Sequence, residues 1–387
     1  MNLHLSNYRI IHLSKYYPPY WGGIENHVRT LATSQVKLGL EVYTICINHQ
    51  PSNQLTREWD RGVNLIRVNR VATIGRFDLC PGIATEMRKL LKYPYTIFHL
   101  HTPNPTMLLA LVRILQPINL VITHHSDVIK QKILKYALRP FEMFVYGKSQ
   151  KILTTSAQYL DGSQFLKTLY RQKVDFLPLA LESLPYVSLS QEAITYAEKL
   201  KATYGTPLWL SVGRLTYYKG YPIAIEALKY VEGKLLIIGI GSLEQELKAL
   251  ADRIGVSDRL IWLGSVSQVE LIGAYHAVTA LWFPSNQRSE GFGMVQIEAM
   301  AAGCPVINAN IPVSGVPWVS RHEQEGLTVP LNDPKALAAA AYRLWKEPGL
   351  RNRFVQASRE RAKYFDPMAM AQKSLECYQS VISEKKS

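Results

Sequence analysis

The sequence predicts an α/β protein of two doubly wound domains, each built on a parallel sheet with helices on both faces. Short apolar segments rich in β-branched residues alternate with amphipathic helical patterns along the chain. This alternation weakens near residue 178 and restarts after residue 205. At 387 residues, the chain also exceeds the ~250–300 residues at which a single core stops growing.

The first domain is expected to span residues 1–187. Its strands are expected at the apolar segments Tyr8–Leu13, Val42–Ile47, Asn64–Val68, Ile97–His101, Leu120–Thr123 and Lys151–Thr154. Between the first two, Ile24–Leu38 carries apolar residues at helical spacing.

The second domain is expected over residues 188–367, with the weakly patterned stretch Pro178–Thr206 as the connection. Its expected strands are Leu208–Val212, Lys234–Gly239, Leu260–Leu263, Ala280–Pro284 and Pro305–Asn308. Its expected helices are Pro222–Leu228, Leu243–Arg253, Gln268–Ala277, Met294–Ala302 and Pro334–Trp345. A final helix, Met368–Ile382, could join either domain by its pattern.

The net charge of +14 is concentrated in the first half, where residues 1–187 carry +11 and residues 188–387 carry +3. Such an excess points to an anionic partner, which could be a lipid surface, a nucleic acid or a charged substrate. The four cysteines form no CxxC or zinc pattern, which favours a reducing compartment. No stretch has the ~18 apolar residues of a membrane span, and the N-terminus lacks the apolar core of a signal peptide.

Gly22 and Gly23 follow the first expected strand and open a helix. Glycine tolerates positive φ and lets a ligand approach the backbone, and the first N–H groups of a helix can bind a phosphate or a hydroxyl. The spacing is not GxGxxG, so it does not favour a nicotinamide cofactor. A plain turn is the alternative.

Arg214 and Lys219 lie in the loop after the first strand of the second domain. Ligands bind at this edge of open α/β sheets, and two cations five residues apart could hold a diphosphate. A solvated basic loop is the alternative.

Glu290 and Glu298 flank the start of a helix that begins near Gly293 and ends at Gly303. If both were helical, they would lie ~12 Å apart along the axis and ~80° apart around it. That exceeds the roughly 5–5.5 Å between the carboxylates of a retaining glycoside hydrolase, so we expect them to contact different parts of one extended ligand. Compensation of the helix dipole would explain Glu290 alone.

Three segments together resemble the retaining glycosyltransferase family 4, whose members have the GT-B fold of two Rossmann-like domains facing across a cleft. They are YYPPYWGGIENHVRTLA, VGRLTYYKG and EGFGMVQIEAMAAGCPVI, and the resemblance spans Tyr8 to about Asp333. It implies that residues 368–387 return to the first domain, that the first domain binds the acceptor and that the second binds the donor.

The resemblance also implies roles for individual residues. Arg214 and Lys219 match the pair on the donor diphosphate, Glu290 the catalytic-site contact to the donor sugar, and Glu298 the contact to the ribose. Backbone groups at Phe292, Gly293 and Met294 would face the sugar or phosphates, and Gly22 and Gly23 would border the donor phosphates and the acceptor. No metal and no cofactor is expected, because the sequence has no Asp-x-Asp motif and these cations can neutralise the diphosphate.

Two histidine pairs end expected strands. The family carries Thr-x-His at Thr123–His125, which matches His125 to a contact with the donor sugar, with His124 as the adjacent alternative. His99 and His101 should point to one face of their strand, but a zinc site there would need a third ligand. His101 could line the acceptor site or be a buried structural histidine.

Residues 128–151 combine basic and aromatic side chains in an amphipathic pattern, and residues 87–93 add a second basic cluster. This composition is typical of a membrane-surface helix, although a solvated helix face is an equal alternative. Neither cluster contains a regular nucleic-acid motif, so no nucleic acid is expected as a partner.

We therefore expect a retaining, metal-independent hexosyltransferase that uses GDP-mannose or a UDP-hexose. Its acceptor would be a glycan or a lipid-linked sugar in bacterial polysaccharide or glycolipid synthesis, with mannosyl transfer as one case. The front-face displacement attributed to the family is expected here as well. The location would be cytoplasmic, and peripheral attachment to an anionic membrane is open. The alternatives are a sugar synthase or phosphorylase of the same fold, and a non-enzymatic nucleotide- or polyanion-binding protein.

Overall fold

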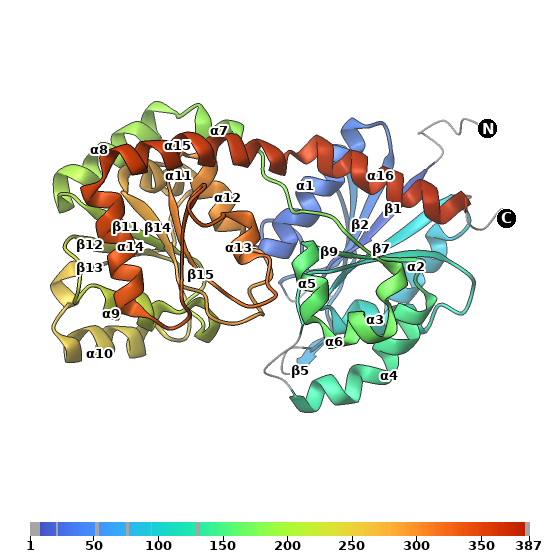
Figure 1. Cartoon of the computed structure of the whole chain (residues 1–387). Helices are drawn as coiled ribbons and strands as arrows, with labels where there is room; N and C mark the ends of the chain where they lie inside the picture. Colours follow the sequence, from blue (N-terminus) through green and yellow to red (C-terminus); the bar gives the residue numbers. More distant parts are fainter. Residues whose placement is uncertain are drawn as a thin grey trace. The chain divides into compact units, whose positions relative to one another are not determined.

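A computed structural model describes residues 8–20, 22–50, 54–74, 77–93, 95–127 and 132–383. The chain forms two compact units, which are described separately (Figure 1). Unit 1 comprises Met1–Ala180 and Pro367–Ser387, and unit 2 comprises Leu181–Asp366. Among the described residues, no helix combines the length and apolar character of a membrane span.

Unit 1 is built on an eight-stranded sheet of order β10-β9-β8-β7-β1-β2-β4-β3, parallel except for the edge strand β3. Its strands are β1 (Arg9–Leu13), β2 (Glu41–Ile47), β3 (Thr56–Asp60), β4 (Val63–Val68), β7 (Thr96–Thr102), β8 (Asn119–His124), β9 (Lys151–Thr154) and β10 (Val174–Phe176). A separate antiparallel pair consists of β5 (Ala72–Ile74) and β6 (Phe77–Leu79).

Helices cover both faces of this sheet, as the sequence predicts for a doubly wound domain. They are α1 (Gly23–Lys37), α2 (Ile83–Leu90), α3 (Pro105–Val112), α4 (Lys132–Lys148), α5 (Ala157–Gly162), α6 (Gln164–Leu169) and α16 (Pro367–Ser383). Apolar residues of α2, α3, α4 and α6 share one core with the sheet, and those of α1 and α16 share the other.

Unit 2 is built on a six-stranded, all-parallel sheet of order β13-β12-β11-β14-β15-β16. Its strands are β11 (Leu208–Val212), β12 (Lys234–Ile238), β13 (Leu260–Gly264), β14 (Ala280–Phe283), β15 (Val306–Ala309) and β16 (Gly326–Val329). Numbered within the unit, the order is 3-2-1-4-5-6, which is that of the Rossmann fold.

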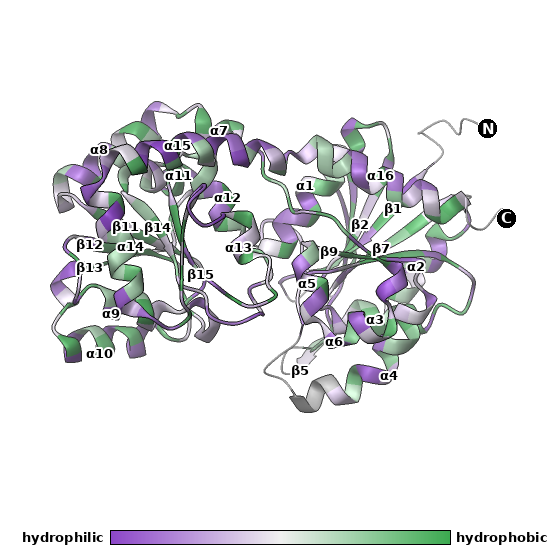
Figure 2. Cartoon of the chain, in the orientation of Figure 1, coloured by the Kyte–Doolittle hydropathy of each residue, from purple (hydrophilic) through white to green (hydrophobic). Residues whose placement is uncertain are grey.

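The helices of unit 2 are α7 (Leu184–Val187), α8 (Gln191–Tyr204), α9 (Tyr221–Ala227), α10 (Glu244–Ile254), α11 (Gln268–Ala277), α12 (Met294–Ala301), α13 (Val316–Val319), α14 (Pro334–Lys346) and α15 (Pro348–Ala362). In both units the strands are largely hydrophobic, whereas helices such as α8 and α10 alternate between hydrophobic and hydrophilic faces (Figure 2). Local signals fix several helix starts. Ser267 and Glu270, for example, form a capping box at α11, and Asp333 caps α14.

The predicted connection, Pro178–Thr206, is wrong in part, because it contains α7 and α8. Both belong to unit 2, where α8 packs on α11 and the backbone carbonyl of Tyr186 in α7 contacts His276. The chain therefore enters unit 2 at Leu181 rather than at the predicted residue 188, and it leaves at Asp366 rather than at 367. The last helix, α16, packs against α1 in unit 1.

Candidate active site

The sheet of unit 2 has a topological switch point between β11 and β14. These two strands are neighbours, and the chain proceeds from them toward opposite edges of the sheet, which opens a crevice at their carboxyl ends. Arg214 and Lys219 follow β11, and Glu290 follows β14. The three predicted donor-site residues therefore come from the two loops where an α/β sheet of this order binds its ligand.

The loop after β11 lies directly against the end of β14. It contains a short 3-10 helix, Tyr217–Lys219, followed by Gly220 with a φ of 69°. A Cβ atom on Gly220 would lie 1.9 Å from the carbonyl oxygen of Pro284, so only glycine permits this approach. The result is an ion pair in which Lys219 Nζ lies 2.7 Å from Glu290 Oε2.

The Glu290 carboxylate is held from several sides and is largely withdrawn from solvent. Ser285 donates its hydroxyl to Glu290 Oε2 at 3.2 Å, and Ser314 donates to the Glu290 backbone carbonyl at 2.7 Å. The side chains of Lys219 and Glu290 are 13% and 11% exposed. Two opposite charges with so little water stabilise each other, and removal of either would leave the other poorly solvated.

The segment between Glu290 and α12 is shaped by aromatic packing. Gly293 has a φ of 81°, and a Cβ atom there would lie 2.7 Å from the ring of Phe283. The Phe292 side chain is buried against Trp318 and Phe365, so only its backbone can contact a ligand. Met294 begins α12, which presents its positive end beside the Glu290 loop.

Glu298 and Arg214 lie in different environments from the Lys219–Glu290 pair. Glu298 is partly buried on α12 and accepts a hydrogen bond from the Tyr275 hydroxyl at 2.8 Å. Burial raises the pKa of Glu298, and the Tyr275 hydrogen bond and the charge of Lys219 act in the opposite direction. Arg214 is exposed, and its side chain takes part in none of the hydrogen bonds or ion pairs found among the described residues.

In unit 1, a group of histidines lies on the face of the sheet that α1 and α16 cover. Because side chains alternate along a strand, residues two positions apart lie on the same face. On this face, apolar residues are followed by histidines. On β1, Ile10 precedes His12, and on β7, Ile97 precedes His99 and His101. The core of this face is therefore apolar at one end of the strands and polar at the other.

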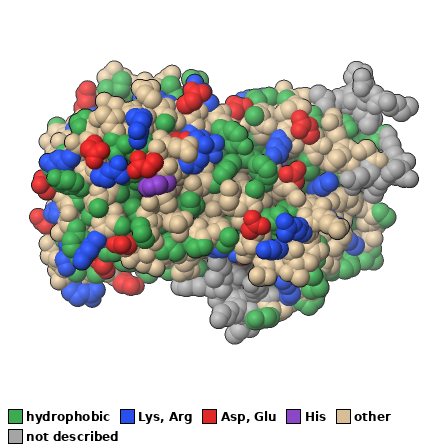
Figure 3. Space-filling view, in the orientation of Figure 1, with side chains coloured by type: hydrophobic (Ala, Val, Ile, Leu, Met, Phe, Trp, Pro, Cys, Tyr) green, Lys and Arg blue, Asp and Glu red, His purple; other side chains and the backbone are tan. Residues whose placement is uncertain are grey.

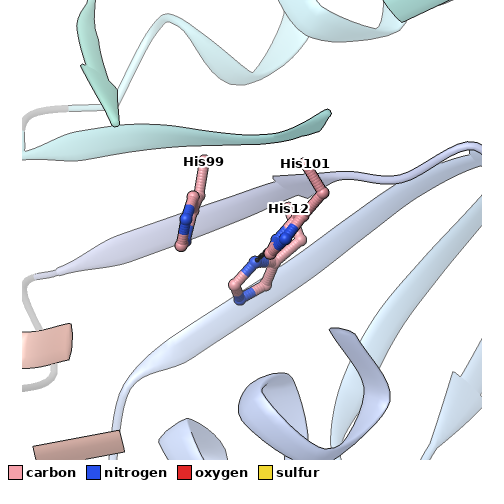
Figure 4. Close-up of side chains that lie close together, drawn as sticks. All are labelled: His12, His99 and His101. Carbon is pink, nitrogen blue, oxygen red and sulfur yellow. Dashed lines mark hydrogen bonds between the residues drawn. The ribbon is translucent and has the colours of Figure 1, made fainter. Parts of the chain in front are cut away.

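These histidines form a hydrogen-bonded row that begins on α1. Gln35 Oε1 lies 2.8 Å from His12 Nε2, and His12 Nδ1 lies 3.0 Å from His101 Nε2. His101 Nδ1 in turn lies 3.2 Å from His125 Nε2, just after β8. The prediction that His99 and His101 share a face is confirmed, since their rings stack at 4.5 Å (Figure 4).

The structure distinguishes His124 from its neighbour His125. Both ring nitrogens of His124 are engaged within the unit, Nδ1 with the Tyr146 hydroxyl at 2.7 Å and Nε2 with Asp127 at 3.1 Å. His125 uses only Nε2 in the hydrogen bonds of the described residues, and 6% of its surface is exposed. Of the two histidines, His125 thus has a ring nitrogen available for a ligand.

Burial keeps the histidines of the row neutral. It lowers the pKa of His12 to about 4 and those of His101 and His125 well below the usual range. His27 on α1 is fully buried beside them, with its ring at an edge-on angle to those of His101 and His125, and its pKa falls to about 3. Both nitrogens of His27 lack a hydrogen-bond partner among the described residues.

Gly22 and Gly23 do not adopt the left-handed conformation that their pairing suggested. Gly22 is extended, with a φ of −174°, and Gly23 is the first residue of α1. A Cβ atom on Gly23 would meet no atom of the described residues within 4 Å. Gly23 thus leaves open space beside the helix start.

Several residues of this constellation escape sequence reasoning. His12, His27, Gln35 and Tyr378 come from three distant segments, and only the pairing of β1 with β7 and of α1 with α16 brings them together. A polar residue at the position where a buried strand should be apolar, as at His12, is the one local signal.

Solved structures show which fold the two sheets define. The sucrose-phosphate synthase of Thermosynechococcus elongatus superposes with a TM-score of 0.80 at 22% identity and covers 97% of this chain and all of its own. The lipopolysaccharide glycosyltransferase WaaG superposes with a TM-score of 0.71 at 17% identity, over 96% of this chain and 99% of its own. Both units together thus have the GT-B fold predicted from the sequence.

Two family models identify the chain more closely. The model described as glycosyl transferases group 1 matches residues 194–361, and the model described as glycosyltransferase family 4 matches residues 21–167. The chain belongs to the group 1 glycosyltransferases, with an amino-terminal domain of the family 4 type.

Two relatives named for their transferase activity align over most of the chain. The O-antigen chain mannosyltransferase C of Escherichia coli is 28% identical, over 96% of both chains. The D-rhamnosyltransferase WbpZ of Pseudomonas aeruginosa is also 28% identical, over 88% of this chain and 87% of its own. The prediction of a hexosyltransferase is therefore confirmed at the level of the enzyme class.

Proposed function

We propose that this enzyme transfers a hexosyl unit from a nucleotide diphosphate sugar to an acceptor hydroxyl, with retention at the anomeric carbon and without a metal. The Lys219–Glu290 pair at the switch point of unit 2 carries this proposal. A cation at this edge of a Rossmann sheet is suited to a diphosphate, and a carboxylate beside it can bind the hydroxyls of the attached sugar.

The chemistry needs no metal if the positive groups of unit 2 take over its role. The bond between C1 and the phosphate oxygen breaks, and the nucleoside diphosphate leaves with the electron pair. Lys219, the exposed Arg214 and the start of α12 would stabilise this charge. The acceptor oxygen bonds to C1 on the same face, and its proton passes to the departing phosphate.

In this proposal, the remaining donor-site residues have separate tasks. Glu298, at some distance along α12, binds the ribose hydroxyls, and the backbone of Phe292, Gly293 and Met294 faces the sugar phosphates. In unit 1, Gly23 leaves room at the start of α1, and His125 binds a hydroxyl of the donor sugar. Both ring nitrogens of His101 and of His124 form hydrogen bonds within unit 1. In this proposal these two histidines therefore support the site without contacting the donor sugar.

The relatives favour a donor and a pathway. The Escherichia coli relative is named for mannosyl transfer to O-antigen, and a Mycobacterium leprae relative, 26% identical over 93% of both chains, for mannosyl transfer to phosphatidyl-myo-inositol. We therefore place GDP-mannose before the UDP-hexoses, and a polysaccharide or glycolipid before soluble sugars as acceptor. These names also weigh against the alternative of a sugar synthase or phosphorylase.

A panel of UDP-, GDP- and ADP-sugars in a thermal-shift assay tests the donor, with and without EDTA. A bound donor raises the melting temperature by mass action, and we expect the largest rise with GDP-mannose, unchanged by EDTA. NMR of the product should show the anomeric configuration of the donor. Transfer that depends on Mn²⁺, or a product of inverted configuration, would contradict the corresponding part of the proposal.

We further propose that unit 1 contacts an anionic membrane surface through α4, at the cytoplasmic face where nucleotide sugars are made. Four large apolar side chains of α4 are exposed, namely Tyr136, Phe141, Met143 and Phe144. The excess charge of +11 lies in the same half of the sequence, whereas charges of both signs are mixed on the visible face of unit 2 (Figure 3). Of the basic residues predicted to take part, Lys130 lies outside the described residues, as do the side chains of Lys132 and Lys135.

Vesicle flotation tests this membrane contact. Binding to vesicles that contain phosphatidylglycerol should be strong at low salt and lost at high salt, since surface charges are screened. Phe141→Ser with Phe144→Ser should weaken it, whereas Tyr342→Ser, at an equally exposed aromatic of unit 2, should not. Equal binding to neutral and anionic vesicles would contradict the proposal.

A further inference from the structure

In the buried row from Gln35 to His125, the hydrogen bonds all have the same donor-to-acceptor direction. This direction is set at Gln35 on α1. Ser374 donates its hydroxyl proton to the Ala371 carbonyl at 2.7 Å, so its oxygen is left to accept a hydrogen bond. Gln35 Nε2 donates to this oxygen at 2.9 Å and to the Tyr378 hydroxyl oxygen at 3.0 Å. The other end of the amide, Oε1, therefore faces His12 and can only accept.

This orientation determines the tautomer of each histidine in turn. A neutral imidazole has one donor and one acceptor nitrogen, so when Nε2 of His12 donates to Gln35, its Nδ1 must accept. His101 then donates through Nε2 to His12 and accepts at Nδ1 from Nε2 of His125. The row ends with His125 carrying its proton on Nε2 and an unprotonated Nδ1.

A second branch leads to the same result. The Tyr378 hydroxyl, having accepted from Gln35, gives its own proton to His99 Nδ1 at 2.7 Å. His99 Nε2 must then donate to the Thr123 hydroxyl oxygen, also at 2.7 Å. With the Nε2–H tautomer, both ring nitrogens of His12, His99 and His101 and the Nε2 of His125 thus have a partner. Both branches begin at the Gln35 amide.

We propose that Gln35 is a positioning residue that fixes His125 as a hydrogen-bond acceptor for a carbohydrate hydroxyl. The inference rests on the proposed function for the identity of the ligand, but not for the tautomers. His125 lies at the carboxyl end of β8, where 6% of its surface is exposed, and a lone pair on Nδ1 can bind only a group that donates. Sugar hydroxyls donate, whereas phosphate oxygens at neutral pH do not.

A metal ion is the competing explanation for so many histidines. Ligand atoms of His12, His99 and His101 lie within 4.8 Å of one another, as do those of His27, His101 and His125. In the first set, however, both ring nitrogens of each histidine already have a hydrogen-bond partner. A metal would have to displace several of these bonds, so the hydrogen-bonded row explains this set better.

NMR of the full-length protein, labelled with ¹⁵N-histidine and purified in EDTA, reads the tautomers directly. Long-range couplings from the ring protons distinguish the protonated from the unprotonated nitrogen, and single His→Gln variants assign the signals. We expect the Nε2–H tautomer at His12, His99, His101 and His125. A proton on Nδ1 of His125 in the wild-type protein, or histidine signals that move when Zn²⁺ is added at equimolar amount, would overturn the proposal.

Three variants separate a positioning role from a merely structural one. Gln35→Met keeps the volume but removes the amide, so His12, His101 and His125 should each show both tautomers. Tyr378→Phe removes only the second branch, so His99 should lose its preference while His125 keeps it. Thr44→Val is the matched control, since Thr44 pairs with His12 across the sheet and its buried hydroxyl has no partner among the described residues.

These variants also define how the proposal fails. A tautomer of His125 that is unchanged in Gln35→Met, or one that changes in Thr44→Val, would overturn it. If Gln35→Met does not fold, the wild-type spectrum and the Tyr378→Phe variant still test the proposal. In Tyr378→Phe, a mixture of tautomers at His125 rather than at His99 would contradict the assignment of the two branches.

Donor analogues test the consequence for binding. One hydroxyl of the donor sugar is proposed to donate a hydrogen bond to His125. Its replacement by fluorine should weaken binding roughly 10-fold, about as much as its replacement by hydrogen, because fluorine cannot donate a hydrogen bond. In Gln35→Met this loss on fluorination should shrink. Full retention of affinity by every monofluoro analogue would overturn the acceptor role of His125. If no nucleotide sugar binds at all, the proposed function fails while the NMR spectra still decide the tautomers.

Discussion

Lys219 Nζ lies 2.7 Å from Glu290 Oε2, in a site where each side chain is nearly buried. The sequence resemblance assigns these residues to two different parts of the donor, the diphosphate and the sugar. In the free protein they satisfy one another, and Ser285 provides a further donor to the same carboxylate oxygen. The pair thus holds both side chains in place before the donor binds. The other N–H groups of the Lys219 ammonium can still donate hydrogen bonds to the diphosphate.

Lys219→Met should lower both stability and nucleotide affinity. Removal of the cation leaves the Glu290 carboxylate poorly solvated, which we expect to cost about 1–3 kcal/mol of unfolding free energy. The affinity for the nucleoside diphosphate should fall about 10-fold with the loss of one charge-assisted contact. Chemical denaturation and calorimetric titration measure the two effects.

The double variant Lys219→Met with Glu290→Gln distinguishes the pair from two independent contacts. If the ion pair is responsible, the second substitution should restore part of the lost stability, because no buried charge is left unpaired. Additive losses of stability would show that the two side chains do not depend on each other.

Glu290→Gln alone should lower turnover strongly while the protein remains folded. The amide keeps the size of the side chain but loses the negative charge beside the reacting sugar, and removal of one such group costs roughly 100-fold or more. Steady-state kinetics with the donor found in the thermal-shift panel measure this loss, and circular dichroism checks the fold. Near-normal turnover would remove Glu290 from the catalytic role.

Glu298→Gln should stabilise the protein at neutral pH while it weakens nucleotide binding. Burial raises the pKa of Glu298 above its ordinary value of 4.5, so its contribution to stability is present at low pH and is lost as the pH rises through the raised pKa. Glutamine avoids this loss and can still accept the hydrogen bond from Tyr275. The gain in melting temperature, on the order of 2–4 °C, should therefore appear above the raised pKa and vanish below it.

Melting curves between pH 4 and pH 8 test the sign of this effect. The Tyr275→Phe variant serves as a comparison, since loss of its hydrogen bond should raise the pKa of Glu298 further and lower stability at neutral pH. A gain for Glu298→Gln that is equal at all pH values would point to packing rather than to ionisation.

Local sequence patterns predicted the parts of the fold that depend on local chemistry. The central strands are short apolar runs. Gly293 and Gly303 bound α12, which begins at the predicted Met294 and ends at Ala301, one residue before its predicted end. The elements that local patterns did not predict have few apolar residues, or they are stabilised by segments distant in the sequence. The edge strand β3, for example, reads TREWD. Helix α8 packs on α11, and its buried residues are only Ala193, Ala197 and Leu200.

The same division holds for the candidate site. The motif residues of unit 2 were found because their loops are adjacent to strand ends, and the order of strands then brings β11 beside β14. The histidine row was found only in part, because His12 and His101 meet through strand pairing over 89 positions of sequence. Neither the periodicity nor the composition of the sequence predicts which strands pair.

Gly23→Ala separates a ligand-binding role of the glycine loop from a structural one. Gly23 is helical, and a Cβ atom there would meet nothing within 4 Å among the described residues, so alanine should leave the fold intact or stabilise it by about 0.4–1 kcal/mol. If the donor phosphates approach this backbone, the added methyl group should lower kcat/KM about 10-fold or more. Gly147→Ala on α4 is the matched control, because Gly147 is helical and equally open but lies away from the predicted site. Equal activity of the two variants would show that no ligand comes close to Gly23, and a loss of stability in Gly23→Ala would show that the open space is needed by the fold itself.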